Sequence, residues 1–515
     1  MTSRLVLVFV LATCIARQAW SQGTGSGPTS TTEDDDEAAG SGSALVAPKD
    51  ARARGDWLRE KLAAAIATRP TLARAKISAL VVDLGSGGEL FAHEPDRGMN
   101  LASNAKLLTT SAALATLGGG FRWRTAVFAD DLDDATGRVK GNLYVRGRGD
   151  PTLSANDLRA LADDVAARGV RQVDGQLVID ASYFDGDVEP PHYADQPKER
   201  AGYRAPIASF GVARGAVTVV VTGVPGANAT VRLEPDAGDY VRLVKAEVTT
   251  EDKKPTKIEV KATPKKDHLE LEVTGRIRVR DGSWDHRYRV DDPVRFAGEV
   301  FRAALVARGV KVGRAIGNGV VPPAAKPIAM HESAPLSLAV REMNKLSDNY
   351  VAETVLKTLG AETRATPGPG TWADGLAAVR AALAKLGLPP TYRYENGSGL
   401  YGSTEISARL LVALLRAGHA DFRIGPDLVA SLPVGGQDGT LAKRWHGRAA
   451  AGRVRAKTGT LDQVVTLAGF VGVDGDHLLA FAILANDIPA GQRGPVRAMA
   501  DDMVDAMVAY LEAAH

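Results

Sequence analysis

The chain has 515 residues, of which 45% are hydrophobic and 24% are charged, as is ordinary for a globular protein of two or three domains. Its formal net charge of +2 is too small for this length to argue for binding to nucleic acid or to an anionic surface. Aromatic residues make up 5% of the chain, too few to suggest a groove that stacks on bases or sugars. Composition therefore gives no support for nucleic acid, an anionic surface or stacked sugars as ligands, and it identifies no other ligand.

The first 21 residues have the pattern of a signal peptide. Arg4 precedes an uninterrupted apolar run over 5–12, and the small residues Ala19 and Ser21 favour cleavage before Gln22. The apolar run is too short to cross a membrane, and no later stretch is long and uncharged enough to form a stable span. We therefore expect a secreted or periplasmic protein.

The only cysteine of the sequence, Cys14, lies inside this predicted signal peptide. Cleavage would leave a mature chain without disulfides, thiolate nucleophiles or cysteine-bound metals. A lipoprotein anchored through Cys14 is the alternative, which the preceding Thr13 disfavours. Residues 22–47 are rich in Gly, Ser, Thr and acidic residues, so we expect a disordered linker there.

The ordered chain begins with a pattern that mixes helices and strands. It predicts a helix starting near Lys49, a β-hairpin over 77–83 and 89–92, and a helix over 103–117 that glycines end. These elements, together with those that follow, indicate an α+β fold.

Short β-like runs broken by turns replace this pattern from 122 to 284. We interpret them as an inserted β-rich region of two small domains, the second at about 213–277. Alternation over 257–260 and 269–273 favours antiparallel pairing there. Helices then dominate to residue 417, and the chain closes with a three-stranded meander and an amphipathic helix over 496–511.

Three short motifs lie in order along the chain: Ser103-Asn104-Ala105-Lys106, Ser347-Asp348-Asn349 and Lys457-Thr458-Gly459. The first stands at a predicted helix start, where unpaired N–H groups face the reacting centre and Lys106 shares a face with Ser103. A serine hydroxyl becomes nucleophilic when a base takes its proton, and a lysine can be that base if burial or another cation lowers its pKa. Alone, this motif is equally well explained as a helix cap with a surface lysine.

The third motif lies on a predicted strand that continues through Thr460. An edge strand can bind an extended peptide by adding it to the sheet, with Lys457 attracting a terminal carboxylate and Gly459 allowing close backbone approach. A solvent-facing lysine, a bulge glycine and a helix-ending turn at 347–349 are the ordinary alternatives. Because all three motifs occur in this order, it is improbable that these ordinary alternatives explain every one of them.

This ordered set resembles the motifs of penicillin-binding proteins and β-lactamases. The first interval between motifs is more than twice the second, which is similar to the class C low-molecular-mass penicillin-binding proteins, D-alanyl-D-alanine carboxypeptidases and endopeptidases. The resemblance implies a β-lactamase/transpeptidase-like domain made of 48–121 and 285–515, interrupted by the β-rich region 122–284. Further matching stretches are 149–153, 180–184, 343–349, 397–400 and 432–441. Asn396 departs from the family, which usually has Asp there.

The resemblance also implies roles for the motif residues. Ser103 would form an acyl ester with Lys106 as its base, Ser347 would relay a proton to the leaving amine, and Asn349 would hold the substrate amide.

For substrate binding, the resemblance implies that Lys457 and Thr458 hold the substrate carboxylate, next to Gly459. The N–H groups of Ser103 and Thr460 would form the oxyanion hole. Peptidoglycan stem peptides would be the substrates and β-lactam antibiotics the inhibitors, with no cofactor or metal.

Two alternatives share this set of residues: a β-lactamase or esterase of the same fold, and a non-catalytic peptidoglycan-binding protein. A zinc peptidase is disfavoured because His93-Glu94 and His331-Glu332 lack a second histidine at helical spacing. Arg148-Gly149-Asp150 is interpreted as a turn rather than an adhesion motif. Carboxypeptidase and endopeptidase activities both stay open at this point.

Overall fold

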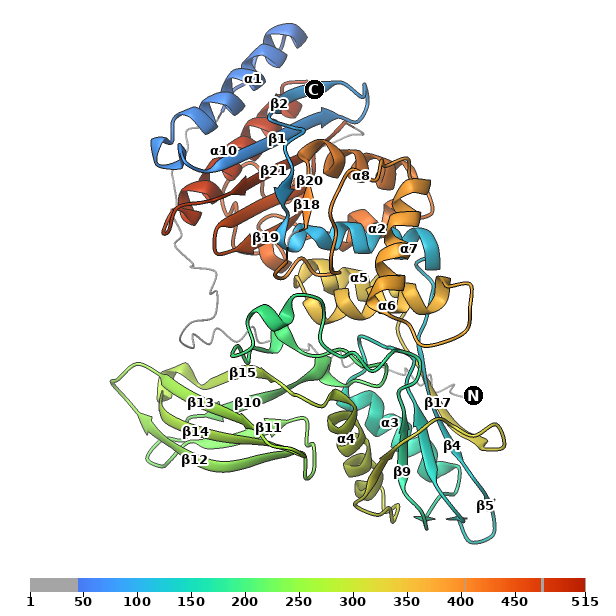
Figure 1. The fold of residues 1–515 in the computed structure, drawn as a ribbon. Coiled ribbons are helices and arrows are strands. Elements are labelled where there is room, and N and C mark those ends of the chain that lie inside the picture. Colours follow the sequence, from blue (N-terminus) through green and yellow to red (C-terminus); the bar gives the residue numbers. More distant parts are fainter. Residues whose placement is uncertain (1–44, 403, 474–476, 515) are drawn as a thin grey trace, which may run out of the picture.

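The computed structural model describes residues 45–402, 404–473 and 477–514. The predicted signal peptide, Cys14 and nearly all of the predicted linker lie outside these residues. The chain folds into two parts, which Figure 1 shows one above the other. One part is built from both ends of the chain, and the other is built from its middle. Among the described residues, none of the helices combines the length and the apolar character needed to cross a membrane.

The central sheet joins the two ends of the chain. Its five strands are antiparallel, in the order β19-β20-β21-β1-β2. The predicted hairpin and the predicted meander form one sheet because β1 pairs with β21, from Lys76 opposite Asn486 to Asp83 opposite Leu479. The strand carrying the third motif, β19, lies at the edge, as predicted. The bounds are β1 Lys76–Asp83, β2 Glu89–His93, β19 Val454–Leu461, β20 Val464–Gly472 and β21 Leu478–Asn486.

Helices cover both faces of this sheet. One face packs against α1 and α10, and the other against α2 and α8. Strands β20 and β21 are therefore buried at almost every position, which is why their sequences are continuous apolar runs without alternation. The first nine residues of α2 are all buried. The helices are α1 Ala51–Ala67, α2 Lys106–Leu117, α5 Leu336–Lys345, α6 Asn349–Thr363, α7 Trp372–Lys385, α8 Ala408–Ala420, α9 Gly425–Ser431 and α10 Arg493–Glu512; the short strands β3 Met99–Asn100 and β18 Glu405–Ile406 pair beside them.

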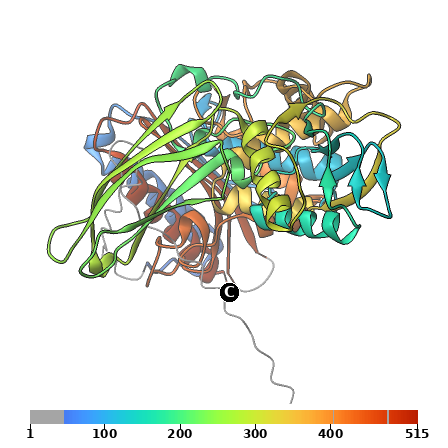
Figure 2. The same cartoon turned by 90° about the horizontal axis from the view of Figure 1, so that it is seen from below.

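The segment between α2 and α5 forms the second part, called here the inserted segment. A five-stranded sheet in the order β16-β9-β7-β4-β17 lies with two helices, and two three-stranded sheets, β11-β10-β15 and β12-β14-β13, lie beside it (Figure 2). One continuous apolar core joins these sheets. The first sheet and its helices comprise β4 Arg124–Ala129, β7 Leu143–Arg146, α3 Ala155–Ala167, β9 Leu177–Asp180, α4 Pro293–Ala307, β16 Ile316–Asn318 and β17 Lys326–Glu332, with a small β5-β6-β8 sheet at Leu132–Asp133, Arg138–Val139 and Gln172–Val173. The others comprise β10 Ala216–Thr222, β11 Thr230–Glu234, β12 Val241–Glu251, β13 Lys257–Pro264, β14 Leu269–Arg278 and β15 Ser283–Arg289.

Two features of the inserted segment differ from the sequence pattern. The segment extends past the expected boundary at 284, because β17 pairs with β4 and β16 pairs with β9. The amphipathic pattern of α4 shows that one face is buried but not which core buries it; Phe296 and Phe301 pack into the core of the inserted segment. The antiparallel pairing expected of β13 and β14 is confirmed, whereas β12 pairs with β14 in parallel.

Candidate active site

Ser103 lies in a tight turn immediately before α2. The turn is a 3-10 helix over Ala102–Ala105, so the regular helix begins at Lys106 and not at Ser103 as the sequence predicted. Ala102 has a φ of 47°, a left-handed conformation that is strained for a residue with a side chain. The turn brings Lys106 Nζ to 3.1 Å from Ser103 Oγ, so the predicted pair is in direct contact.

Lys106 is completely buried. Burial lowers the pKa of its ammonium from 10.5 to about 7, against the opposing charges of Glu353 and Asp348. Besides Ser103, its Nζ contacts two oxygen acceptors, Asn349 Oδ1 at 2.7 Å and the carbonyl of Ser398 at 2.8 Å. A neutral amine has two N–H groups and one lone pair. The two acceptors engage both N–H groups, which leaves the lone pair for the proton of the Ser103 hydroxyl.

The second motif connects α5 to α6. Ser347 has a φ of 57°, and Asp348 caps α6 by accepting the N–H of Val351 at 3.0 Å. Asn349 is the first residue of the helix, which places its side chain beside Lys106. Its Nδ2 donates to the carbonyl of Tyr203 in the inserted segment, at 3.2 Å. The loop therefore presents a hydroxyl and an amide toward the same site.

Lys457 reaches the site from the edge strand β19. It is completely buried, and its Nζ donates to Ser347 Oγ at 2.9 Å and to the carbonyl of Thr458 at 2.7 Å. Thr458 Oγ1 donates to Thr440 Oγ1 at 2.8 Å. The outer edge of β19 is bridged at Arg455 by Val434, before the third motif begins.

Gly459 sits where the edge strand touches the nucleophile turn. A Cβ atom at this position would lie 2.6 Å from the carbonyl of Leu101 and 3.1 Å from the backbone nitrogen of Ser103. Only glycine lets β19 approach so closely. Thr460, the next residue, is paired with Val465 of β20.

Two further side chains, which the sequence analysis did not single out as site residues, build the wall behind Lys106. Glu353, completely buried on α6, accepts the N–H of Ser398 at 2.8 Å and that of Gly397 at 3.1 Å. Burial raises the pKa of Glu353, and these N–H groups oppose the rise. The sequence pattern around Glu353, four residues after Asn349 on a helix, does not distinguish it from a glutamate that is exposed to solvent. Asn396 accepts the N–H of Gly399 at 2.7 Å and donates to the carbonyl of Leu400 at 3.0 Å, a bond that an ionised Asp could not make.

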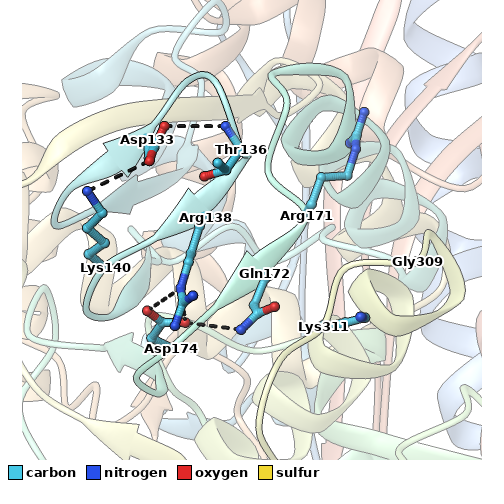
Figure 3. A pocket seen from close by; sticks show the side chains of 9 residues that line it. All are labelled: Asp133, Thr136, Arg138, Lys140, Arg171, Gln172, Asp174, Gly309 and Lys311. Atoms are coloured by element: carbon cyan, nitrogen blue, oxygen red, sulfur yellow. Dashed lines mark hydrogen bonds and ion pairs between the residues drawn. The ribbon is translucent and has the colours of Figure 1, made fainter.

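The eight predicted site residues therefore lie on three neighbouring stretches of chain, and the contacts of Ser103 with Lys106, Lys106 with Asn349 and Lys457 with Ser347 join them. His331 instead lies by Asp150, with Nε2 3.6 Å from Oδ2, and within the described ranges no three His, Cys, Asp or Glu side chains are placed to hold a metal. A cavity of about 760 Å³ lies elsewhere, in the inserted segment (Figure 3). Its charges are largely paired internally, with Arg138 bound to Asp174 at 2.7 Å.

Comparison with known proteins adds independent evidence. Residues 58–510 match the protein family described as D-Ala-D-Ala carboxypeptidase 3 (S13). The D-alanyl-D-alanine carboxypeptidase of Actinomadura sp. (strain R39) is 36% identical over 478 residues, which cover 89% of this chain and 85% of that protein. The crystal structure of penicillin binding protein 4 (dacB) from Haemophilus influenzae is 20% identical, with a TM-score of 0.70 and coverage of 88% of this chain and 98% of that one. The same protein complexed with a β-lactam is 21% identical, with a TM-score of 0.66 and coverage of 85% and 98%. This likeness confirms the α+β fold with its β-rich insertion.

Proposed function

The chain belongs to the D-Ala-D-Ala carboxypeptidase 3 (S13) family of serine-type enzymes, and we propose that Ser103 is its nucleophile and Lys106 the base that activates it. Family membership confirms the resemblance drawn from the three motifs. The assignment of Lys106 as the base rests on its environment. Burial lowers its pKa to about 7, and the two N–H groups of the neutral amine already have acceptors. In its neutral form such an amine directs its lone pair at the Ser103 hydroxyl and can accept its proton.

In the proposed reaction, Ser103 Oγ attacks the carbonyl carbon of the penultimate D-alanine as its proton passes to Lys106 Nζ. The carbonyl oxygen gains negative charge, which the N–H groups of Ser103 and Thr460 would stabilise. Gly459 supports this role because it brings β19 against the backbone of Ser103. Ser347, held by Lys457, relays to the departing amine the proton that Lys106 took from Ser103, and the C–N bond breaks to leave an acyl ester on Ser103 with Lys106 neutral and Ser347 protonated again.

Lys457 and Thr458 would hold the terminal carboxylate of the substrate, and Asn349 its amide. Lys457 lies on the edge strand, where an extended peptide can add to the sheet. Water then attacks the acyl carbon, the ester C–O bond breaks, and a proton from that water passes by way of Lys106 to Ser103 Oγ. β-Lactams would acylate the same hydroxyl; in support, a relative with this fold has been crystallised with a β-lactam.

We place this activity outside the cytoplasm, on peptidoglycan stem peptides. The leader-like segment before Gln22 supports this location. N-terminal sequencing of the protein recovered from the cell envelope or medium should give Gln22 as the first residue. An intact Met1 would overturn the location.

The direct test of the site is covalent labelling with a fluorescent penicillin. The wild type should be labelled, and Ser103→Ala should not. Mass spectrometry of the products from defined muropeptides then separates the two activities: D-alanine release shows carboxypeptidase action, and cleavage of cross-linked dimers shows endopeptidase action. Undiminished labelling of Ser103→Ala would refute the proposed nucleophile, and rapid repeated turnover of a cephalosporin would favour a β-lactamase.

A further inference from the structure

Arg214 of the inserted segment contacts the second motif directly. Arg214 donates from Nη1 to Asp348 Oδ2 at 2.8 Å and from Nη2 to Glu342 Oε2 at 2.7 Å. Glu342 lies near the end of α5, and Asp348 caps the start of α6. A single side chain therefore clamps the two helices on either side of Ser347.

The backbone is strained on both sides of this ion pair. Ala213, Arg214 and Gly215 are consecutive left-handed residues, with φ values of 49°, 54° and 61°. Ser347, beside Asp348, has a φ of 57°. Residues with side chains adopt this conformation only where surrounding contacts enforce it, and such positions cluster at functional sites. Here the strain aims the guanidinium at Asp348 and turns the Ser347 hydroxyl toward Lys457.

The charge balance around Asp348 depends on the inserted segment. Burial would raise the pKa of Asp348, but Arg214 and Arg287, with smaller contributions from the Val351 N–H and Lys106, hold it below its usual value. Arg287, on β15, also donates to the carbonyl of Ala213 at 2.7 Å and so braces the left-handed turn. Lys106 also lowers the pKa of Asp348, by less than either arginine. The two cations with the largest effect thus come from outside the catalytic helices and sheet.

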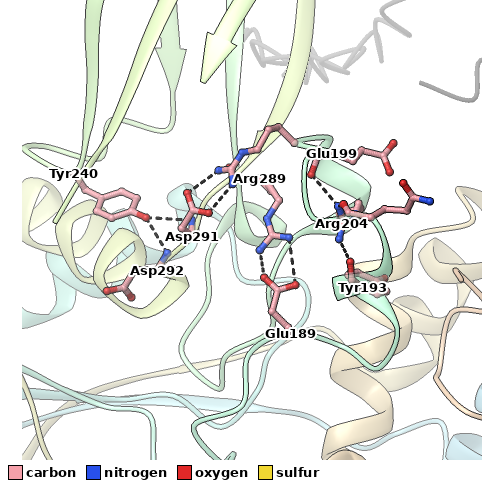
Figure 4. Close-up of polar contacts among 10 residues, drawn as sticks. Glu189, Tyr193, Glu199, Arg204, Tyr240, Arg289, Asp291 and Asp292 are labelled. Carbon is pink, nitrogen blue, oxygen red and sulfur yellow. Dashed lines mark hydrogen bonds and ion pairs between the residues drawn. The ribbon is translucent and has the colours of Figure 1, made fainter. Parts of the chain in front are cut away.

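A second contact joins the same loop to the inserted segment. Asn349 donates to the carbonyl of Tyr203. The next residue, Arg204, is buried and donates to the carbonyls of Tyr193 and Glu199 (Figure 4). The same stretch is tied to β15 by the ion pair of Glu189 with Arg289. The inserted segment is therefore held rigidly where it meets the motif.

We infer that Arg214 is a positioning residue, through which the inserted segment keeps Ser347 within reach of Lys457 and Asn349 within reach of Lys106. The inference rests on the proposed roles of Ser347 and Asn349. It assigns the inserted segment a part in the reaction itself. Without the clamp, the strained loop relaxes, and both side chains leave the positions that acylation of Ser103 requires.

The test is the rate of acylation at saturating fluorescent penicillin. Arg214→Gln should acylate at least about tenfold more slowly, because a displacement of 1 Å in a catalytic group has effects of this size or larger. The matched control is Arg302→Gln: Arg302 also lies in the inserted segment and binds a carboxylate, that of Glu299 at 2.7 Å, within α4. It should acylate within about twofold of the wild type. A wild-type rate for folded Arg214→Gln overturns the inference, whereas an unlabelled wild type would instead refute the proposed function.

A double-mutant cycle separates positioning from general stability. Asp348→Asn removes the charge but keeps an oxygen that can cap α6. In this background Arg214→Gln should change the rate by less than about threefold, because the ion pair is already lost. An undiminished tenfold loss would show that Arg214 does not act through Asp348. If Arg214→Gln does not fold, Arg214→Lys keeps the charge but lacks the planar fork that binds two carboxylates; a lowered rate supports the clamp and a wild-type rate overturns it.

Discussion

Burying Lys106 should make the free energy of unfolding depend on pH in a way that one substitution can isolate. Its pKa is about 7 in the folded protein and 10.5 when exposed. Between these values the unfolded chain binds more protons than the folded one, so stability rises with pH across this window. At about 1.4 kcal/mol for each pKa unit, the penalty is roughly 5 kcal/mol below pH 7 and disappears near pH 10.5.

Lys106→Met removes this titration while keeping a side chain of similar length. It also deprives Asn349 Oδ1 and the Ser398 carbonyl of a donor, which costs about 1–3 kcal/mol for each group. The two effects are of similar size at low pH, so the variant should be about as stable as the wild type at pH 6. Between pH 7 and pH 9 the wild type should gain roughly 2–3 kcal/mol relative to the variant.

Urea denaturation at pH 6, 7, 8 and 9 measures this difference, and Ser103→Ala is the control. The control lacks the hydroxyl but keeps the lysine, so its stability should run parallel to that of the wild type at every pH. A constant difference between the wild type and Lys106→Met from pH 6 to pH 9 would refute the reasoning, because it would mean that Lys106 titrates near its ordinary value in the folded protein.

Two further predictions concern the acylation reaction and a third concerns stability. The rate of labelling by penicillin should rise about tenfold per pH unit below pH 7 and level off above it, because only neutral Lys106 accepts the proton; a rate that does not change between pH 5.5 and 8 would contradict this role. Gly459→Ala should lower the rate about tenfold or more by pushing β19 away from the nucleophile turn, whereas Gly494→Ala, whose Cβ meets nothing within 4 Å, should label normally. Lys345→Met should lower the melting temperature by several degrees because it leaves the carboxylate of Asp438, now bound at 2.6 Å, without its cation; an unchanged melting temperature would show that this ion pair contributes nothing.

The three motifs predicted which side chains lie together because each motif carries its own local structure. Ser103 precedes a helix, Ser347 follows one, and Lys457 lies on a strand, and these expectations locate three side chains on three elements. What brings them together is long-range pairing of β1 with β21, for which sequence periodicity has no signal. The pairing of Arg214 with Asp348, 134 residues apart, could not be predicted for the same reason.

The remaining differences between prediction and structure concern which residues are buried, and against which core. Glu353 is a charged residue on a helix, and such residues are usually solvated, yet it is completely buried and holds the backbone that accepts from Lys106. The helix α4 has an apolar face that would fit either core, so the sequence could not show that it completes the inserted segment.

The two buried lysines explain why the Ser347–Asn349 loop is the centre of the site. Each lysine binds a neutral side chain of this loop, Lys106 the amide of Asn349 and Lys457 the hydroxyl of Ser347. A shift of the loop would therefore disturb both lysines at once. The charge that the loop does contain, on Asp348, faces away toward Arg214. The arginines of the inserted segment offset the charge of Asp348, and burial holds the pKa of Lys106 at about 7, where a large fraction of the amine is neutral and still basic enough to take a proton.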